Sequence, residues 1–194
     1  MEAFLISAGI VALAEIGDKT QLLAIFLAAR FKRPVPIILG IFAATLLNHA
    51  LAGIIGSWLH ATLGPDIMRW ILGLSFIAMA IWIMIPDKLD NDEIKAAPRF
   101  GIFGATLLAF FLAEMGDKTQ FATIALAARF DNLFAVILGT TLGMMVANVP
   151  AVLIGDAAAK KLPTHLVHIL AAFIFAGLGI AALWDAVPDA LTGR

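Results

Sequence analysis

Long apolar runs separated by short polar connections dominate the chain. Six runs of helical length can be read, over residues 4–29, 34–59, 67–86, 101–128, 133–158 and 165–187. They are too long for the strands of a membrane β-barrel and do not alternate polar with apolar residues. Because a spanning helix takes about 20 residues, the pattern predicts an all-α, polytopic membrane protein with six transmembrane helices.

The two halves of the chain repeat each other at an offset of 99 residues. AEIGDKTQLLAIFLAARF (residues 14–31) aligns with AEMGDKTQFATIALAARF (residues 113–130), and 12 of the 17 positions from Glu15 to Phe31 are identical. Each half holds three runs, and because three is odd, the second half enters the membrane from the opposite side. The chain is therefore predicted to form two inverted three-helix repeats, residues 1–86 and 101–194, joined by a charged cytoplasmic linker, residues 87–100.

Composition and charge narrow the possible functions. The chain is 62% hydrophobic and 14% charged, whereas an ordinary soluble domain is about 25% charged. A net charge of −1 gives no basic footprint for nucleic acid, and the lack of cysteine excludes disulfides and thiolate metal sites. With the N-terminus outside, the cytoplasmic loops hold eight Lys and Arg residues against three on the outer side. The positive-inside rule then places both termini outside.

Each repeat carries a charged heptapeptide near the middle of its first apolar run. The copies read EIGDKTQ (residues 15–21) and EMGDKTQ (residues 114–120). On a continuous helix, Glu15 and Asp18 would lie about 60° apart, with Lys19 on the same face. A charge buried in the membrane costs about 2.5–3.5 kcal/mol, so the two segments should face each other and pool their charges. A purely structural network, in which each Lys neutralises an acid of its own helix, remains an alternative.

The pooled charges predict a site for a divalent cation. Four carboxylates and two ammonium groups sum to −2, which one divalent cation or two protons would cancel. Oxygen ligands suit Mg²⁺, Ca²⁺ or Mn²⁺, whereas a soft metal would need sulfur or several imidazoles. The predicted ligands are Glu15, Asp18, Glu114 and Asp117, with Thr20, Gln21, Thr119 and Gln120 as secondary ligands and Lys19 and Lys118 as charge partners.

Other polar and small residues inside the runs are weaker signals. Asn48, His49 and Asn148 lie in mid-span, where they would either extend the ion pathway or form interhelical hydrogen bonds. Gly17 and Gly116 permit close helix contact or local unwinding beside the acids. Gly139 and Gly143 have the spacing of a close helix-packing motif and need no further function.

At the heptapeptides the sequence resembles the Gdt-type cation/proton exchangers, small six-span proteins with two copies of Glu-x-Gly-Asp-Lys/Arg-Thr/Ser. The resemblance covers essentially the whole chain. It implies that Glu15, Asp18, Glu114 and Asp117 bind the cation, with Thr20 and Thr119 at the hydroxyl position. Eukaryotic members supply manganese and handle calcium in the Golgi, and bacterial relatives export manganese. The short central loop and the lack of a leader resemble bacterial members, so the resemblance favours Mn²⁺ and a bacterial inner membrane.

The leading hypothesis is a transporter, not an enzyme, that exports Mn²⁺, or alternatively Ca²⁺, from the cytoplasm in exchange for protons. Its partners would be the lipid bilayer, divalent cations and protons, without nucleic acid and without a cofactor beyond the transported ion; the sequence fixes no oligomeric state. One alternative is an intramembrane aspartyl protease that uses Asp18 and Asp117 as a pair sharing a proton. Others are an exporter of cationic amino acids and an ion channel.

Overall fold

The chain forms helices throughout the part that the structure describes. The computed structural model describes residues 1–85, 101–154 and 164–192, and the predicted linker, residues 87–100, lies outside this part. The all-α prediction is confirmed for these ranges. In chain order the helices are α1 (Glu2–Glu15), α2 (Lys19–Phe31), α3 (Pro34–Thr62), α4 (Pro65–Trp82), α5 (Gly101–Glu114), α6 (Lys118–Arg129), α7 (Leu133–Ile154) and α9 (Thr164–Thr192).

The apolar runs become helices in two different ways. α3, α7 and residues Thr164–Val187 of α9 are single helices long and apolar enough to cross a membrane. The first and fourth runs are instead broken at the heptapeptides into α1 with α2 and α5 with α6. The prediction that Glu15, Asp18 and Lys19 share the face of one continuous helix is therefore wrong. The cause lies in the glycines: Gly17 and Gly116 have φ of 86° and 76°, a left-handed conformation that glycine adopts without steric cost.

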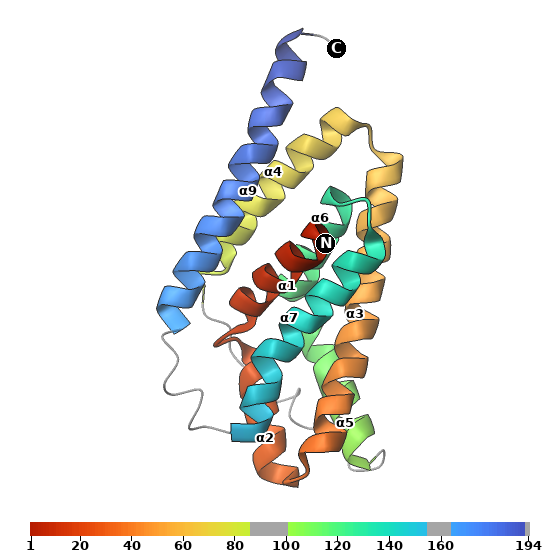
Figure 1. Ribbon diagram of the computed structural model, residues 1–194, viewed down its shortest axis with the longest axis vertical. Coiled ribbons are helices and arrows are strands. Elements are labelled where there is room, and N and C mark those ends of the chain that lie inside the picture. The colour runs from red at the N-terminus through yellow and green to blue at the C-terminus, as the bar shows by residue number, and fades with distance from the viewer. Residues whose placement is uncertain (86–100, 155–163, 193–194) are drawn as a thin grey trace.

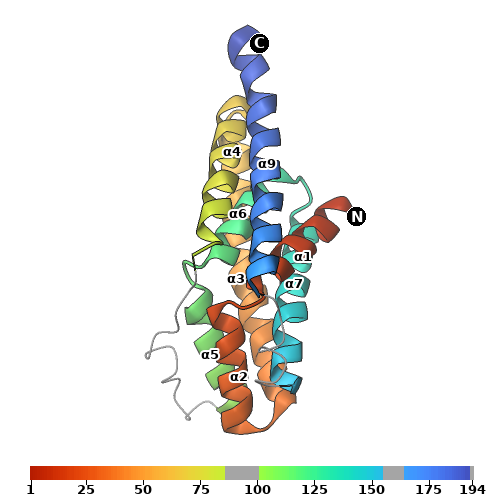
Figure 2. The same cartoon turned by 90° about the vertical axis from the view of Figure 1, so that its left-hand side faces the viewer.

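The helices are arranged as a bundle with a pair of helices beside it. α4 and α9 run antiparallel to each other, and α9 extends past the upper end of the bundle (Figure 1). Figure 2 shows this pair beside the upper part of the bundle, with α2 and α5 at the lower end. Within the bundle, α1 packs on α7 and α3 packs on α5. The first helix of each half thus packs on the second span of the other half, and neither half completes its packing alone.

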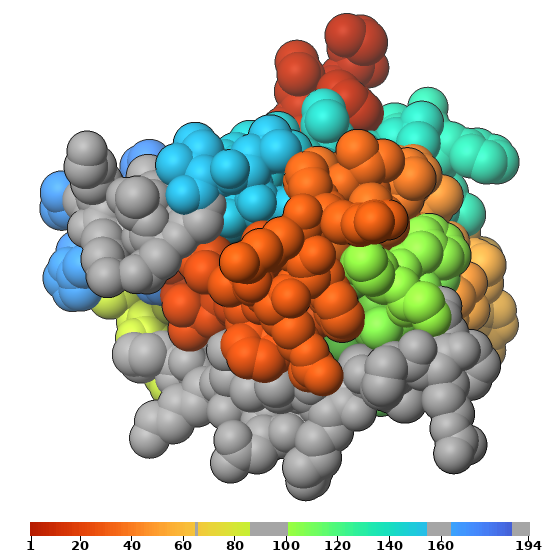
Figure 3. All heavy atoms as spheres, turned by 90° about the horizontal axis from the view of Figure 1, so that it is seen from below, coloured from red at the N-terminus to blue at the C-terminus, as the bar shows by residue number. Residues whose placement is uncertain are grey.

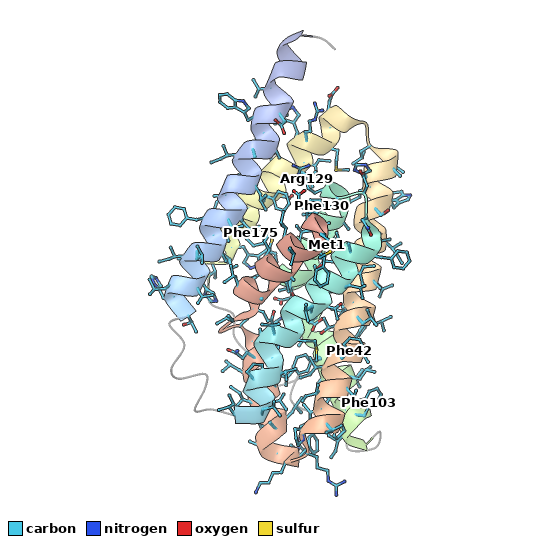
Figure 4. All side chains as sticks on the ribbon, in the orientation of Figure 1. Met1, Phe42, Phe103, Arg129, Phe130 and Phe175 are labelled. Carbon is cyan, nitrogen blue, oxygen red and sulfur yellow. The ribbon has the colours of Figure 1, made fainter. Side chains whose placement is uncertain are left out.

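Some pairs of residues that lie 99 positions apart in the sequence are neighbours in space. Phe76 of α4 and Phe175 of α9 are ring neighbours, with centroids 6.1 Å apart; Figure 4 labels Phe175 on α9. Asp18 and Asp117, just before α2 and α6, also come together, with carboxylate oxygens within 4.8 Å. The repeat seen in the sequence is thus accompanied by contacts between equivalent residues.

Small residues bring the helices close, and large apolar residues cover the outside. A Cβ added at Gly139 or Gly143 of α7 would stand 2.5 Å from a backbone carbonyl oxygen of α1. The prediction that these glycines serve helix packing is confirmed. Phe173 and Trp184 of α9 are 73% and 75% exposed, as suits helices that face lipid. Seen from below, the bundle ends in α2 with the start of α3, α5 and the last turns of α7 (Figure 3).

Alanine at Gly143 should destabilise the protein, whereas alanine at Gly177 should not. At Gly143 the new methyl group would force α1 and α7 apart, and overpacking of this kind costs about 1–3 kcal/mol. In the described part of the chain no atom lies within 4 Å of a Cβ added at Gly177, so Gly177→Ala should gain up to about 1 kcal/mol of helix propensity. Thermal unfolding of the purified variants in detergent measures both effects. Equal unfolding temperatures would contradict the close packing of α1 on α7.

Candidate cation site

Both heptapeptides fold into the same break. Asp18 is the N-cap residue of α2 and Asp117 that of α6, each with an extended backbone. In both copies the N–H of the Asp donates a hydrogen bond to the carbonyl of the Glu three residues earlier, at 3.1 Å. The two aspartates thus lie at the positive ends of two helix dipoles, where a negative charge is stabilised.

The glutamine of each heptapeptide holds its break in shape. The Gly17 N–H donates to Oε1 of Gln21 at 2.9 Å, and the Gly116 N–H donates to Oε1 of Gln120 at 2.8 Å. A side chain at the third helical position that reaches back to a backbone N–H resembles one half of a capping box. The sequence predicts these glutamines as secondary ligands. In the structure, their amide oxygens accept hydrogen bonds from the backbone of the break.

Three of the four predicted acids converge. The carboxylates of Glu15, Asp18 and Asp117 offer oxygens that all lie within 4.8 Å of one another. Their exposed fractions are 0%, 3% and 2%, so the cluster is enclosed. Like charges this close in a buried site repel, and the arrangement is stable only when positive charge, from a cation or protons, shares it. These residues come from both halves of the chain.

Glu114 is also fully buried but is held by another set of contacts. Thr45 Oγ1 donates to its Oε1 at 2.8 Å and Asn48 Nδ2 to its Oε2 at 3.3 Å. On the opposite side, Asn148 Nδ2 donates to Glu15 Oε1 at 3.3 Å. Asn48 and Asn148 therefore make the interhelical hydrogen bonds that the sequence offered as one reading. Thr45 was missed, although it lies three residues before Asn48 and so on the same face of α3.

The two lysines reach different partners. Lys19 Nζ lies 3.8 Å from a carboxylate oxygen of Asp117, an acid of the other heptapeptide. Lys118 Nζ donates to the carbonyl of Ile85, just beyond the end of α4, at 2.7 Å. Lys19 thus forms an ion pair that links the two halves, and the expectation that each Lys pairs with an acid of its own helix stays a prediction.

Several buried polar atoms of the predicted site have no hydrogen-bond partner among the described residues. They include Glu15 Oε2, Thr20 Oγ1, Thr119 Oγ1, Asn48 Oδ1, Asn148 Oδ1 and both ring nitrogens of His49. Buried polar atoms normally have partners, so each exception needs an explanation. All but the two His49 nitrogens are oxygens, the ligand type that hard divalent cations prefer.

The two breaks are covered unequally. A Cβ added at Gly17 would stand 2.6 Å from the Thr164 side chain, and His168 Nε2 of α9 lies 2.7 Å from the carbonyl oxygen of Ile16. At Gly116 no atom of the described residues lies within 4 Å of an added Cβ. The start of α9 thus covers the break at Gly17, while no described residue covers the break at Gly116 in the same way.

Comparison with known proteins identifies the family. The family model for the divalent cation/proton antiporter GDT1 matches the chain twice, over residues 3–91 and 102–190. The chain belongs to the GDT1 family. As a GDT1 protein it is a membrane transporter and not an enzyme, and the intramembrane protease alternative falls away.

Relatives of this GDT1 chain extend over nearly its whole length. It is 52% identical over 182 residues to a Vibrio cholerae protein named "Putative manganese exporter", covering 93% of this chain and 90% of that one. A GDT1-like protein of Synechocystis is 29% identical over 206 residues, covering 96% and 99%. GDT1-like protein 3 of Oryza sativa is 27% identical, covering 93% and 73%. No solved structure matches the chain.

Alanine at either break glycine should destabilise the fold, and more strongly at Gly17. A left-handed backbone costs a residue with a Cβ about 1–2 kcal/mol. At Gly17 the new methyl group would in addition meet Thr164, whereas at Gly116 it would meet no atom of the described residues within 4 Å. Thermal unfolding in detergent should therefore rank Gly17→Ala below Gly116→Ala, and both below the wild type. Gly9→Ala is the control, because no atom of residues 1–85, 101–154 or 164–192 lies within 4 Å of the added Cβ. The reverse ranking would contradict the cover by α9.

Proposed function

We propose that the protein exports Mn²⁺ from the cytoplasm in exchange for external protons, across the inner membrane of a bacterium. The observation that carries this proposal is the enclosed convergence of Glu15, Asp18 and Asp117 within 4.8 Å, with Glu114 as the fourth acid. Carboxylates coordinate a metal only when ionised, so metal and protons compete for the same oxygens. A site of this kind can release one cargo only as it takes up the other.

The choice of cation rests on donor chemistry together with the relatives. Oxygen donors favour Mn²⁺, Ca²⁺ or Mg²⁺ over soft metals. The name of the Vibrio cholerae relative, at 52% identity, supports manganese and the outward direction. Carboxylate oxygens gathered within 4.8 Å suit a compact ion better than the ammonium group of an amino acid, whose organic part would need its own pocket.

The proposed architecture is six spans in two inverted repeats, residues 1–86 and 101–194, with both termini outside. Discontinuous helices whose ends meet at the substrate recur in transporters built from inverted repeats. The breaks between α1 and α2 and between α5 and α6 have this form. The contact of Phe76 with Phe175, 99 residues apart, also supports a two-fold relation between the halves.

Alternating access would explain why the site is both buried and unequally covered. All four acids are at most 3% exposed, so a cation enters or leaves only after a rearrangement. An exchanger needs two states that open the site to opposite sides. Thr164 and His168 cover one break, and no described residue covers the equivalent break in the same way, which supports a structure in which the two sides are already distinct.

Purified protein in proteoliposomes should couple a Mn²⁺ gradient to proton flux in the opposite direction. Neutralising Glu15, Asp18, Glu114 or Asp117 as the amide should lower this flux by about tenfold or more, since even groups around a metal site contribute 10–100-fold to affinity. Asp131→Asn is the matched control, because this acid is 97% exposed. Mn²⁺ movement without proton movement in the wild type, or near-normal flux in both Glu15→Gln and Glu114→Gln, would overturn the proposal.

Single-cysteine labelling tests the inverted topology. Lys32 follows α2 and Asp131 follows α6, so these residues are equivalent in the repeat. A cysteine at position 32 should react only from the cytoplasm and one at position 131 only from outside. The chain contains no native cysteine, so the background is clean. Labelling of both cysteines from the same side would refute the inverted topology, independently of the transport assay.

A further inference from the structure

One buried methionine lies beside the carboxylate cluster. Met144 of α7 has an exposed fraction of 0%. Its Sδ lies 3.0 Å from Nδ2 of Asn148, and the same Nδ2 donates to Oε1 of Glu15 at 3.3 Å. A single amide nitrogen thus separates a thioether sulfur from one of the three converging acids.

The repeat shows which residue of the first half is equivalent to this methionine. Met144 is equivalent to Thr45, whose hydroxyl donates directly to Glu114 at 2.8 Å. In one half, Thr45 contacts the heptapeptide glutamate directly. In the other half, Met144 lies next to the Asn148 amide, and this amide contacts the glutamate. A hydroxyl in one half is replaced by a sulfur in the other.

The surroundings of Met144 differ from those of a methionine that only fills the apolar core. The next residue, Met145, is partly buried and packs against the apolar cluster formed by α2, α3, α5 and α7. Met144 instead meets the amide of Asn148, whose Oδ1 has no hydrogen-bond partner in the described part of the chain. An unbranched thioether is flexible, so a modest rotation can bring its sulfur toward the acids.

We propose that the Met144 thioether contacts the cation held by Glu15, Asp18 and Asp117 and sets its selectivity. Ca²⁺ and Mg²⁺ are hard ions that take oxygen ligands, whereas sulfur favours the softer transition-metal ions. One sulfur added to an oxygen-rich site tilts the preference toward Mn²⁺ without making the site specific for soft metals. This inference rests on the proposed function, because it presumes that the cluster carries the cation.

The test compares cation preference in the wild type, Met144→Leu, Met144→Thr and Met145→Leu. Leucine keeps the volume and removes the sulfur, and threonine copies the residue at the equivalent position of the first half. Mn²⁺-driven proton flux in proteoliposomes is measured against rising Ca²⁺ and Mg²⁺. Both Met144 variants should become more sensitive to Ca²⁺ and Mg²⁺ by about tenfold, the lower end of effects seen around metal sites. Met145→Leu should match the wild type.

A binding readout keeps the test decisive if a variant transports poorly. Thermal shift of the detergent-purified proteins with Mn²⁺, Ca²⁺, Mg²⁺ and the softer Cd²⁺ gives the preference without transport. Loss of the Mn²⁺ and Cd²⁺ advantage in both Met144 variants would support the inference. An unchanged preference in both would overturn it, even if transport fell. A wild type that binds no divalent cation would instead overturn the proposed function.

Discussion

Mutual repulsion among buried acids is the constraint around which this structure is arranged. Glu15, Asp18 and Asp117 bring carboxylate oxygens within 4.8 Å of one another in an interior with almost no solvent contact. Such a cluster needs compensating positive charge, and the fold supplies only part of it. Lys19 reaches Asp117 across the two halves, and each Asp lies at the positive end of a short helix. The remaining charge is what a divalent cation or protons would provide.

The broken helices follow from that constraint. On an unbroken helix, Glu15 and Asp18 would be fixed neighbours on one face, and the backbone would offer nothing to a charge at mid-membrane. The left-handed turn at Gly17 places Glu15 at the end of one helix and Asp18 at the start of the next. Gln21 closes the turn by accepting the glycine N–H, and the second heptapeptide repeats the same bond. The motif therefore encodes a local backbone shape as well as a set of acids.

The sequence alone predicts the helical class and the meeting of the acids, because charges at mid-span must avoid lipid and two such segments can do so only together. It predicts the break less well, because periodicity treats Glu15 and Asp18 as parts of one helix, and Gly17 only permits unwinding. The residues of α3 and α7 that contact the two glutamates could be predicted only in part from the sequence. Asn48 and Asn148 stand out as polar residues in apolar runs, whereas Thr45 and Met144 blend into them. The packing between the two halves determines which face of α3 contacts Glu114. A local sequence pattern does not contain this information.

The two halves agree in their motifs and differ around them, and the differences are chemically meaningful. Among the described residues, Thr45 and Asn48 give the Glu114 side chain two hydrogen bonds, whereas the Glu15 side chain receives one, from Asn148, whose amide also contacts the Met144 sulfur. His49 stands where the other half has Asn148, and its buried ring nitrogens have no partner among the described residues. A site made of two identical halves would hold its cargo equally well in either orientation. Unequal support of the two glutamates makes the orientations unequal in free energy, and a ligand can shift such an equilibrium only by its differential affinity for the two states. The divergence between repeats is thus where unequal cation affinities of the two states and a preference among cations would be encoded, while the shared heptapeptides supply the charge that both require.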